Sequence, residues 1–415
     1  MPARSFYVHN LGCKVNRAES DLIGTALRAA GGVQASQEDA ELIVINTCTV
    51  TAEAEAKTRK AIRKAALGPQ APWVIATGCA IALGQAGFEA LGKRVIAEPD
   101  KLRACDRALE LLGLMPASEE ATRACLAQGE GLGTRRGIKV QDGCDNACSY
   151  CIVPTARGRG VSLSVEEVLA QVLDAEAAHV REIMLTGVNI GAYHHKGHDL
   201  ASLVQRLLEN TSDLRIRLSS LEPQHCSSDV LGLMATWHGR LCAHLHLPLQ
   251  SGCDRTLRDM HRHYDVELFA QLVGTARRLM PQIALTTDLM VGFPGESDRD
   301  FEESLAFCKE MGFSKMHIFR YSLRPGTLAA QRTDQVAPEV RATRSVRMRE
   351  LARQMERADA QKRVGRVEQV LVEGDGRGTS ESYHRVLVDK GITKGSLIQL
   401  QFTQCRDTLL SGIPV

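Results

Sequence analysis

The stretch Val140-Gln-Asp-Gly-Cys-Asp-Asn-Ala-Cys-Ser-Tyr-Cys151 places three cysteines within eight residues, in the spacing C-x3-C-x2-C. Thiolates at this density suit an iron–sulfur cluster, which normally takes four cysteine ligands. Three ligands leave one iron with an open coordination position, and open positions are typical of metal centres that carry out chemistry. We therefore predict that Cys144, Cys148 and Cys151 hold a catalytic cluster. A zinc knuckle without its fourth ligand, or three ordinary buried thiols, is the alternative.

Strands and helices alternate from this stretch to residue 319. Such alternation predicts parallel strands with helices packed on them. Six units are too few to close an eight-stranded barrel, so we expect residues 135–335 to form an open, partial (βα)6 barrel within an α/β protein. The six expected strands are residues 138–141, 182–185, 215–218, 244–247, 284–290 and 315–319.

Each of these strands runs into a loop of small or polar residues. Ligands of parallel barrels bind in the loops that follow the strands. Small residues let the backbone approach a ligand, and hydroxyl or carboxylate groups can hold a ribose or an amino-acid head group. One such loop is weak evidence, but a set around one barrel mouth predicts a binding site. The loops after the second to sixth strands are residues 186–189, 219–223, 248–252, 292–296 and 321–326.

Residues 1–115 contain three further expected strands, at 6–9, 41–46 and 73–77, and each is followed by a cysteine. Helical patterns between them predict a second, N-terminal parallel sheet domain. Because ligands gather at the carboxyl ends of parallel strands, Cys13, Cys48 and Cys79 should project from one edge and form a second cluster site. The alternative is that each cysteine is a small apolar residue between strand and helix.

The remaining segments divide into a linker, a helix and a β-rich end. Residues 116–134 are rich in Gly, Ala and Glu and are expected to be a linker. An arginine-rich helix is expected at residues 336–362, and it either contacts phosphates or is a solvated helix with i,i+4 ion pairs. Alternating apolar residues within 363–415 predict a small antiparallel β domain.

The composition leads us to expect a soluble, reduced, cytoplasmic protein with no membrane partner. Of the 415 residues 44% are hydrophobic, and the net charge is +2, so overall charge does not point to nucleic acid. The 13 cysteines are an odd number in a long chain without a visible secretory signal, unlike a disulfide framework. No apolar run is long enough to cross a bilayer. We expect most histidines to lie in loops and face solvent.

Both cysteine triplets and the loop series resemble the methylthiotransferase branch of the radical S-adenosylmethionine (SAM) superfamily, over essentially the whole chain. The resemblance implies SAM and two [4Fe–4S] clusters. Cys144, Cys148 and Cys151 would hold the cluster that binds and cleaves SAM. Cys13, Cys48 and Cys79 would hold the auxiliary cluster, which is tied to the transferred sulfur. The SAM contacts implied in the same way are Tyr150, Thr186, Gly187, Asn189, Ser219, Gln250 and Gly292.

A short motif around the first cysteine separates the subgroups of this family. Leu11-Gly-Cys-Lys-Val-Asn16, followed by Glu19-Ser20, resembles the enzymes that modify N6-threonylcarbamoyladenosine in tRNA. Isopentenyladenosine enzymes more often have Gly-Cys-Gln-Met-Asn, and those that modify an aspartate of ribosomal protein S12 have Gly-Cys-Pro-Lys-Asn. The resemblance therefore implies methylthiolation at C2 of the threonylcarbamoyl base at position 37, next to the anticodon, with these other two substrates as alternatives.

The same resemblance implies several partners. They are tRNA, a low-potential electron donor and a sulfur source, and the β-rich end resembles the TRAM barrel that helps related enzymes hold RNA. An interpretation of another class is a non-enzymatic iron–sulfur or zinc protein that binds RNA. That interpretation leaves the polar loops around the barrel unexplained.

Overall fold

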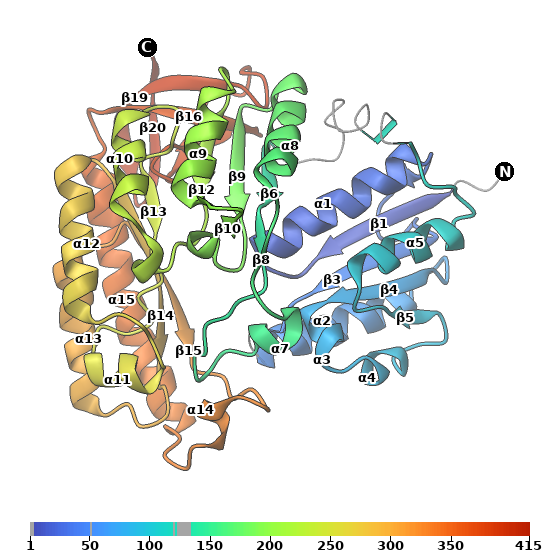
Figure 1. Ribbon diagram of the computed structural model, residues 1–415, viewed down its shortest axis with the longest axis horizontal. Coiled ribbons are helices and arrows are strands. Elements are labelled where there is room, and N and C mark those ends of the chain that lie inside the picture. The colour runs from blue at the N-terminus through green and yellow to red at the C-terminus, as the bar shows by residue number, and fades with distance from the viewer. Residues whose placement is uncertain (1–3, 50–51, 119–120, 123–133) are drawn as a thin grey trace.

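The structure, a computed structural model, describes residues 4–49, 52–118, 121–122 and 134–415 (Figure 1). Cys125 and most of the predicted linker lie outside these ranges. Three parts are visible: an N-terminal domain, a barrel domain beside it, and a C-terminal barrel at one end (Figure 1). Within the described ranges, no helix combines the length and apolarity needed to span a bilayer.

The N-terminal domain is a five-stranded parallel sheet in the order β2-β1-β3-β4-β5. Apolar residues fill both faces, as parallel sheets covered by helices require; Ile43 and Ile45 pack on one side, and Leu42 and Val44 on the other. The three expected strands are β1, β3 and β4. The two short edge strands, β2 and β5, were not predicted, because two or three residues are too few to show an alternation of apolar and polar side chains. The strands are β1 (Ser5–Asn10), β2 (Val33–Gln34), β3 (Leu42–Thr47), β4 (Trp73–Gly78) and β5 (Val95–Ala97); the helices are α1 (Lys14–Ala29), α2 (Ala52–Ala66), α3 (Cys79–Leu83), α4 (Ala86–Glu89) and α5 (Lys101–Leu111).

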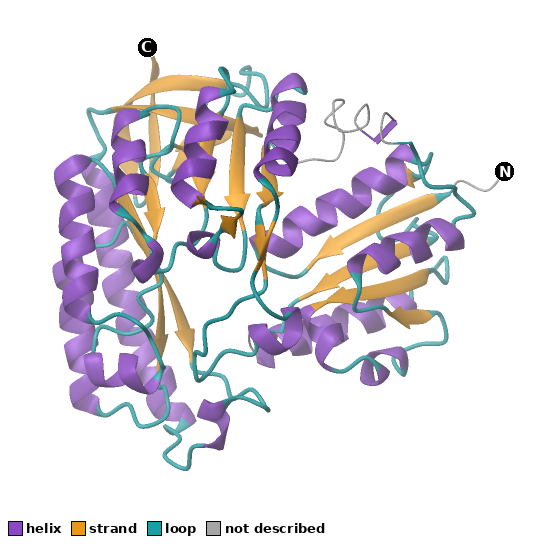
Figure 2. Cartoon of the chain, viewed as in Figure 1, coloured by secondary structure: helices purple, strands orange, loops and turns teal. Residues whose placement is uncertain are grey.

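The barrel domain has six parallel strands, as expected, in two three-stranded sheets. Isolated parallel bridges from Ile216 to Leu241 and from Ser220 to His246 join the sheets into one open wall. Helices cover its outer face (Figure 2). The strands are β6 (Arg135–Lys139), β9 (Glu182–Thr186), β12 (Arg215–Leu218), β13 (His244–His246), β14 (Ala284–Val291) and β15 (Lys315–Arg320); the covering helices are α8 (Val165–Ala177), α9 (Leu200–Glu209), α10 (Ser228–Thr236), α12 (Val266–Leu279), α13 (Asp298–Met311) and α15 (Pro338–Lys362).

Short elements occupy the connections of the barrel domain. The strand pair β7–β8 lies next to the cysteine triplet, and α7 follows the triplet directly. Helix starts are marked by side-chain caps: Ser164 and Glu167 form a capping box at α8, and Ser297 and Asp300 form one at α13. The short elements are β7 (Gln141–Asp142), β8 (Val161–Ser162), β10 (His194–His195), β11 (His198–Asp199), α7 (Val153–Arg157), α11 (Asp254–Asp259) and α14 (Leu328–Gln331).

Helix α15, the predicted basic helix, is part of the barrel's cover. Met348 and Ala352 join the barrel core, and Arg344 is buried against Glu296 at 2.7 Å. Most of the other cations on this helix bond to carboxylates or carbonyls of the chain. Internal ion pairs therefore occupy much of the charge that could have contacted phosphates.

The C-terminal domain is a closed five-stranded barrel in the order β16-β17-β18-β20-β19. Its strands pair antiparallel except for β18 and β20, which close the barrel as a parallel pair. Strand β17 was not predicted, because Arg377-Gly-Thr-Ser380 lacks apolar alternation. The strands are β16 (Val367–Gly374), β17 (Arg377–Ser380), β18 (Arg385–Leu387), β19 (Leu397–Arg406) and β20 (Leu409–Pro414).

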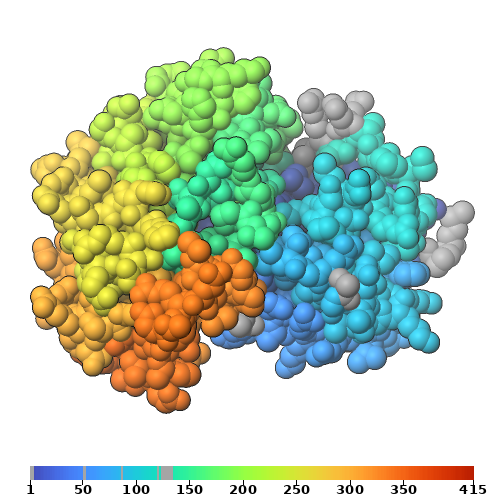
Figure 3. Space-filling view, turned by 60° about the horizontal axis from the view of Figure 1, so that its bottom comes forward, coloured from blue at the N-terminus to red at the C-terminus, as the bar shows by residue number. Residues whose placement is uncertain are grey.

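An ionic cluster docks the C-terminal barrel onto the amino ends of the barrel strands. Glu182 on β9 is fully buried between Arg135, Arg215 and Arg217. Arg217 also donates to the carbonyls of Glu381 and Ser380, at 2.9 and 3.0 Å. The opposite, carboxyl ends of the strands carry the loops predicted to bind ligands. Helix α1 of the N-terminal domain contacts β6, so the two larger domains lie side by side (Figure 3).

Candidate active site

One cavity of about 1060 Å³ lies where the three domains meet. All six predicted cluster ligands line it, namely Cys13, Cys48, Cys79, Cys144, Cys148 and Cys151. The fold therefore brings together two triplets of cysteines that are far apart in sequence.

The N-terminal triplet follows three neighbouring strands. β1, β3 and β4 are adjacent and parallel, and the cysteines lie just before α1, just after β3 and at the start of α3. Paired amides fix this edge: Asn16 Nδ2 donates to Asn46 Oδ1 at 2.7 Å and to the Thr47 carbonyl at 3.1 Å. In return, Asn46 Nδ2 donates to the Asn16 carbonyl at 2.9 Å. Both amides are buried, so the loops that carry the cysteines are held in place.

The second triplet lies in the loop between β7 and α7. The backbone amide of Cys144 donates to the Gly158 carbonyl at 3.1 Å, across the base of the loop. The amide of Ser149 donates to the Met260 carbonyl at 3.1 Å, which ties the middle of the loop to the barrel. These bonds hold the loop against the barrel mouth.

Two buried arginines bring positive charge to the cysteines. Arg262 Nη1 donates to Cys148 Sγ at 3.2 Å, and Arg157 Nε donates to Cys79 Sγ at 3.1 Å. A cation beside a thiol favours the thiolate, which is the form that binds metal. Burial raises the pKa of Cys151 to about 12, so a bound metal must displace a proton from this thiol.

Three buried polar atoms lie on the cavity at the carboxyl ends of the barrel strands. Thr186 Oγ1, Asn189 Oδ1 and Ser219 Oγ make no hydrogen bond among the described residues. The backbone amide of Asn189 donates to Gln141 Oε1 at 2.9 Å, which fixes its loop. Because buried polar groups are normally hydrogen-bonded, these three atoms are available to a ligand.

The other predicted SAM contacts divide into two groups. Tyr150, Gly187 and Gln250 line the cavity, whereas Gly292 is not among the described residues that do so. Gly292 has a φ of +70°, and a Cβ there would lie 2.1 Å from Arg341 Cγ. The structure thus places Gly292 against α15, where a glycine permits close approach of the helix. Its role as a SAM contact stays a prediction.

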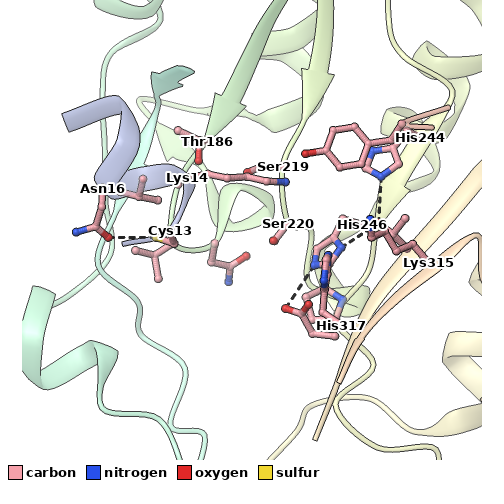
Figure 4. Close-up of a pocket in the computed structure, with 18 of the residues that line it drawn as sticks. Cys13, Lys14, Asn16, Thr186, Ser219, Ser220, His244, His246, Lys315 and His317 are labelled. Carbon is pink, nitrogen blue, oxygen red and sulfur yellow. Dashed lines mark hydrogen bonds and ion pairs between the residues drawn. The ribbon is translucent and has the colours of Figure 1, made fainter. Parts of the chain in front are cut away.

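Histidines line the interior of the barrel, on β13 and β15 (Figure 4). His244 Nε2 and His246 Nδ1 lie 3.0 and 2.9 Å from Thr286 Oγ1, and His246 Nε2 lies 3.4 Å from Asp288 Oδ2. Burial lowers the pKa of His244. The expectation that histidines mostly face solvent is wrong for His244 and His246, which are buried, whereas His317 is exposed and lines the cavity. Residues two apart on a strand share a face, and on β13 this is the inner face.

The C-terminal barrel provides the third wall. The ring of Tyr383 packs on that of His244, with 4.8 Å between centroids, and its centroid lies 5.5 Å from Lys14 Nζ. Arg377 and Arg385 line the same cavity from exposed positions. Among the described residues, seven lysines and arginines but only three carboxylates line the cavity. A net positive cavity suits a polyanion.

Known proteins with similar sequences place this chain in a family. The radical SAM superfamily matches residues 138–308, and "Uncharacterized protein family UPF0004" matches residues 5–95. The chain is 35% identical over 367 residues to threonylcarbamoyladenosine tRNA methylthiotransferase MtaB of Chlamydia pneumoniae, covering 88% of this chain and 85% of that protein. It is 34% identical over 405 residues to tRNA-2-methylthio-N(6)-dimethylallyladenosine synthase of Trichlorobacter lovleyi, covering 90% and 89%. The chain belongs to the radical SAM tRNA methylthiotransferase family.

Solved structures agree on the fold of this methylthiotransferase. The radical SAM methyltransferase TsrM from Kitasatospora setae has a TM-score of 0.57 at 16% identity, covering 79% of this chain and 77% of that one. The predicted α/β fold class, with its N-terminal parallel sheet, is confirmed. The prediction that the chain is a SAM-dependent enzyme is confirmed by its relatives.

The cavity fits the groups that the radical SAM fold implies, SAM and a [4Fe–4S] cluster. Each triplet offers soft thiols with a guanidinium beside one of them, which suits an iron–sulfur cluster. The unpartnered atoms of Thr186, Asn189 and Ser219 can accept or donate hydrogen bonds, which suits the amino-acid and ribose parts of SAM.

The structure adds residues of this methylthiotransferase that had no predicted role. Arg157 and Arg262 contact cysteine sulfurs, and Lys14 extends into the cavity (Figure 4). Arg157 had a weak signal, because it ends the helix that directly follows the cysteine triplet. Arg262 had none, because its loop after α11 reaches Cys148 through the tertiary fold alone.

Proposed function

We propose that this methylthiotransferase acts on N6-threonylcarbamoyladenosine at position 37 of tRNA and adds a methylthio group at C2. The observation that carries the proposal is that both cysteine triplets face one cavity with an excess of positive charge. The Gly-Cys-Lys-Val-Asn motif and the name of the Chlamydia pneumoniae relative support the threonylcarbamoyl substrate. The Trichlorobacter lovleyi relative is named for dimethylallyladenosine, so the isopentenyl form is the second candidate.

In this proposal the two triplets hold two [4Fe–4S] clusters. When bound, they supply the reductive cleavage of SAM and the sulfur that is transferred, with an electron donor and a sulfur source as partners. Cys144, Cys148 and Cys151 bind the first cluster, and the N-terminal triplet binds the second.

The protein's own residues bind, orient and shield the reacting groups. Thr186, Asn189 and Ser219 hydrogen-bond the polar groups of SAM, since Thr186 Oγ1, Asn189 Oδ1 and Ser219 Oγ have no other partner among the described residues. Arg262 and Arg157 stabilise thiolates at the two cluster sites.

The substrate base must leave any helical stack to reach this cavity, which suits a nucleotide in the anticodon loop. Arg377 and Arg385 are exposed on the C-terminal barrel at the cavity. We propose that they contact RNA phosphates, which positions the loop without reading its sequence. This gives the domain the role expected of a TRAM barrel.

Mass spectrometry of tRNA nucleosides tests the substrate. Cells that lack this chain should lose the methylthio form of threonylcarbamoyladenosine and keep the methylthio form of isopentenyladenosine. Loss of the isopentenyl form instead would overturn the proposal in favour of the second candidate.

Cysteine variants of the purified protein test the division between the two triplets. Cys148→Ala should abolish SAM cleavage, whereas Cys48→Ala should retain some SAM cleavage and yield no methylthio product. Product formation by Cys48→Ala would remove the auxiliary-cluster assignment.

A further inference from the structure

We propose that Lys14 binds the carboxylate of the threonylcarbamoyl group and so selects this substrate over bases with a neutral N6 substituent. This inference rests on the proposed function. Lys14 is the first residue of α1 and directly follows Cys13. Its side chain extends into the cavity, toward Ser219, which follows β12, and His244 on β13 (Figure 4). It therefore lies between the N-terminal cysteine edge and the barrel interior.

Most cations of the cavity have a carboxylate partner. Arg157 pairs with Glu19 at 3.0 Å, Arg262 with Glu222, Arg135 with Glu182, and Lys315 with Glu356 at 3.6 Å. Three cations differ: Lys14, Arg377 and Arg385 have no ion pair within the described parts of the chain. A ligand with negative charge can therefore bind these three without breaking an internal pair.

The three unpaired cations differ in their surroundings. Arg377 and Arg385 are exposed on the C-terminal barrel, which suits phosphates of the RNA backbone. Lys14 is half-buried, and its Nζ lies 5.5 Å from the centroid of the Tyr383 ring. This cation–π contact steadies the ammonium and leaves its charge unneutralised. A carboxylate inside the cavity is the partner that Lys14 lacks.

The candidate substrates differ in the group that Lys14 would meet. The threonylcarbamoyl substituent ends in a carboxylate, which forms a charge-assisted hydrogen bond with a lysine ammonium. An isopentenyl substituent is a neutral hydrocarbon and would leave the ammonium desolvated without a partner. Specificity can come from such a penalty as well as from the favourable contact.

Binding to labelled anticodon stem-loop RNA tests this role. The full chain, with both clusters reconstituted and no SAM, is titrated with RNAs that carry threonylcarbamoyladenosine, its methyl ester or adenosine at position 37. We expect wild-type protein to bind the acid about tenfold more tightly than the ester, equivalent to about 1.4 kcal/mol. Lys14→Gln should remove this preference and leave the affinity for the adenosine RNA unchanged, and Lys14→Arg should keep most of it. In turnover, Lys14→Gln should raise KM far more than it changes kcat.

Arg385→Gln is the control for a phosphate contact. This variant should weaken binding to all three RNAs alike and reduce the dependence of the RNA affinity on salt concentration. Iron content and the visible spectrum of Lys14→Gln show whether the clusters beside Cys13 are retained. The ester comparison uses wild-type protein alone, so it tests the proposal even if the variant fails to fold.

Each outcome decides between the two proposals. The proposed role of Lys14 in binding the carboxylate is overturned if the Lys14→Gln variant still binds the acid RNA more tightly than the ester RNA. It is also overturned if wild-type protein binds both RNAs equally. If that wild-type protein still methylthiolates threonylcarbamoyladenosine, the proposed function stands. Activity on isopentenyladenosine RNA instead would refute the proposed function itself.

Discussion

Arg157 donates hydrogen bonds to side chains from three separate parts of the chain. Nη1 lies 3.0 Å from Glu19 Oε1 and 2.8 Å from Asp142 Oδ1, and Nε lies 3.1 Å from Cys79 Sγ. The side chain of Arg157 is 5% exposed and that of Glu19 4%. Burial opposes ionisation of Glu19, but Arg157 and two lysines outweigh it and lower the pKa of this carboxyl. One guanidinium thus connects helix α1, strand β7 and Cys79.

Replacing Arg157 should affect both stability and the proposed auxiliary cluster. Arg157→Gln should lower the free energy of unfolding by about 3 kcal/mol, because breaking a buried ion pair leaves a charge uncompensated. It should also lower the reduction potential of the auxiliary cluster, since hydrogen bonds to cysteine sulfur favour the reduced state. Thermal unfolding and a redox titration followed by electron paramagnetic resonance measure the two effects.

Arg159→Gln is the matched control, because Arg159 is 92% exposed and pairs with Asp145 on the surface. It should leave both the unfolding transition and the potential unchanged. An unchanged potential in Arg157→Gln would show that its contact with Cys79 has no electronic role.

At the scale of elements, the N-terminal cysteine edge depends on how β4 turns into α3. Gly78 ends β4 with a φ of +96°, a conformation that favours glycine. A Cβ at this position would lie 2.5 Å from Asn46 Oδ1 and 2.7 Å from the Thr47 carbonyl. The turn therefore leaves room for the paired amides that hold the other two cysteine loops.

Gly78→Ala should disturb the auxiliary site and spare the barrel site. The added methyl group would clash with the backbone of Thr47 and with the buried side-chain amide of Asn46, and neither can shift without a large cost in free energy. We expect the variant to bind about half the iron of wild-type protein (one cluster in place of two) and to retain SAM cleavage without forming product. Iron analysis and quantification of 5′-deoxyadenosine check this.

Gly84→Ala, at the end of α3, offers a matched control. A Cβ there has no neighbour within 4 Å among the described atoms, so its iron content should equal that of wild-type protein. Full iron loading of Gly78→Ala would contradict this account of the turn.

Across the molecule, Glu182 and its three arginine partners join the barrel domain to the C-terminal barrel. Its three arginine partners include Arg215 and Arg217, which also donate to carbonyls of the C-terminal barrel. Burial alone would raise the pKa of Glu182, but the arginines outweigh burial and hold the pKa well below its usual range. Glu182 therefore stays ionised in a buried position and fixes the barrel that completes the cavity.

Glu182→Gln should destabilise the protein in a pH-dependent way. At pH 7 we expect a loss of about 3–5 kcal/mol, because three arginines lose their counter-charge. A carboxyl with a lowered pKa in the folded state stabilises the protein above its unfolded pKa of about 4.3. This stabilisation is lost as the pH falls from there toward the folded pKa. Thermal unfolding at a series of pH values should therefore show the largest difference from wild type at neutral pH.

Glu302→Gln controls for a surface carboxylate. Glu302 pairs with Arg347 in an exposed position, so its loss should leave the transition unchanged at every pH. A pH-independent effect of Glu182→Gln would show that its charge does not hold the domains together.

The longer strands, their alternation with helices and both cysteine triplets can be identified from the sequence. Hydrophobic period and cysteine spacing are local properties, so β1, β3, β4 and the six barrel strands could be predicted from them. The position of the N-terminal cysteines at one edge also followed, because adjacent parallel strands end at the same side.

The tertiary structure alone decided which side chains meet across domains. Arg262 reaches Cys148, and Lys14 reaches Tyr383, between segments far apart in the chain. It also placed Gly292 against α15 and turned His244 and His246 inward. These contacts depend on how three domains pack, and no local pattern carries that information. The cysteines that could bind metal could be recognised from the sequence. The positive charge of the cavity and the position of Lys14 in it arise from the packing of the three domains.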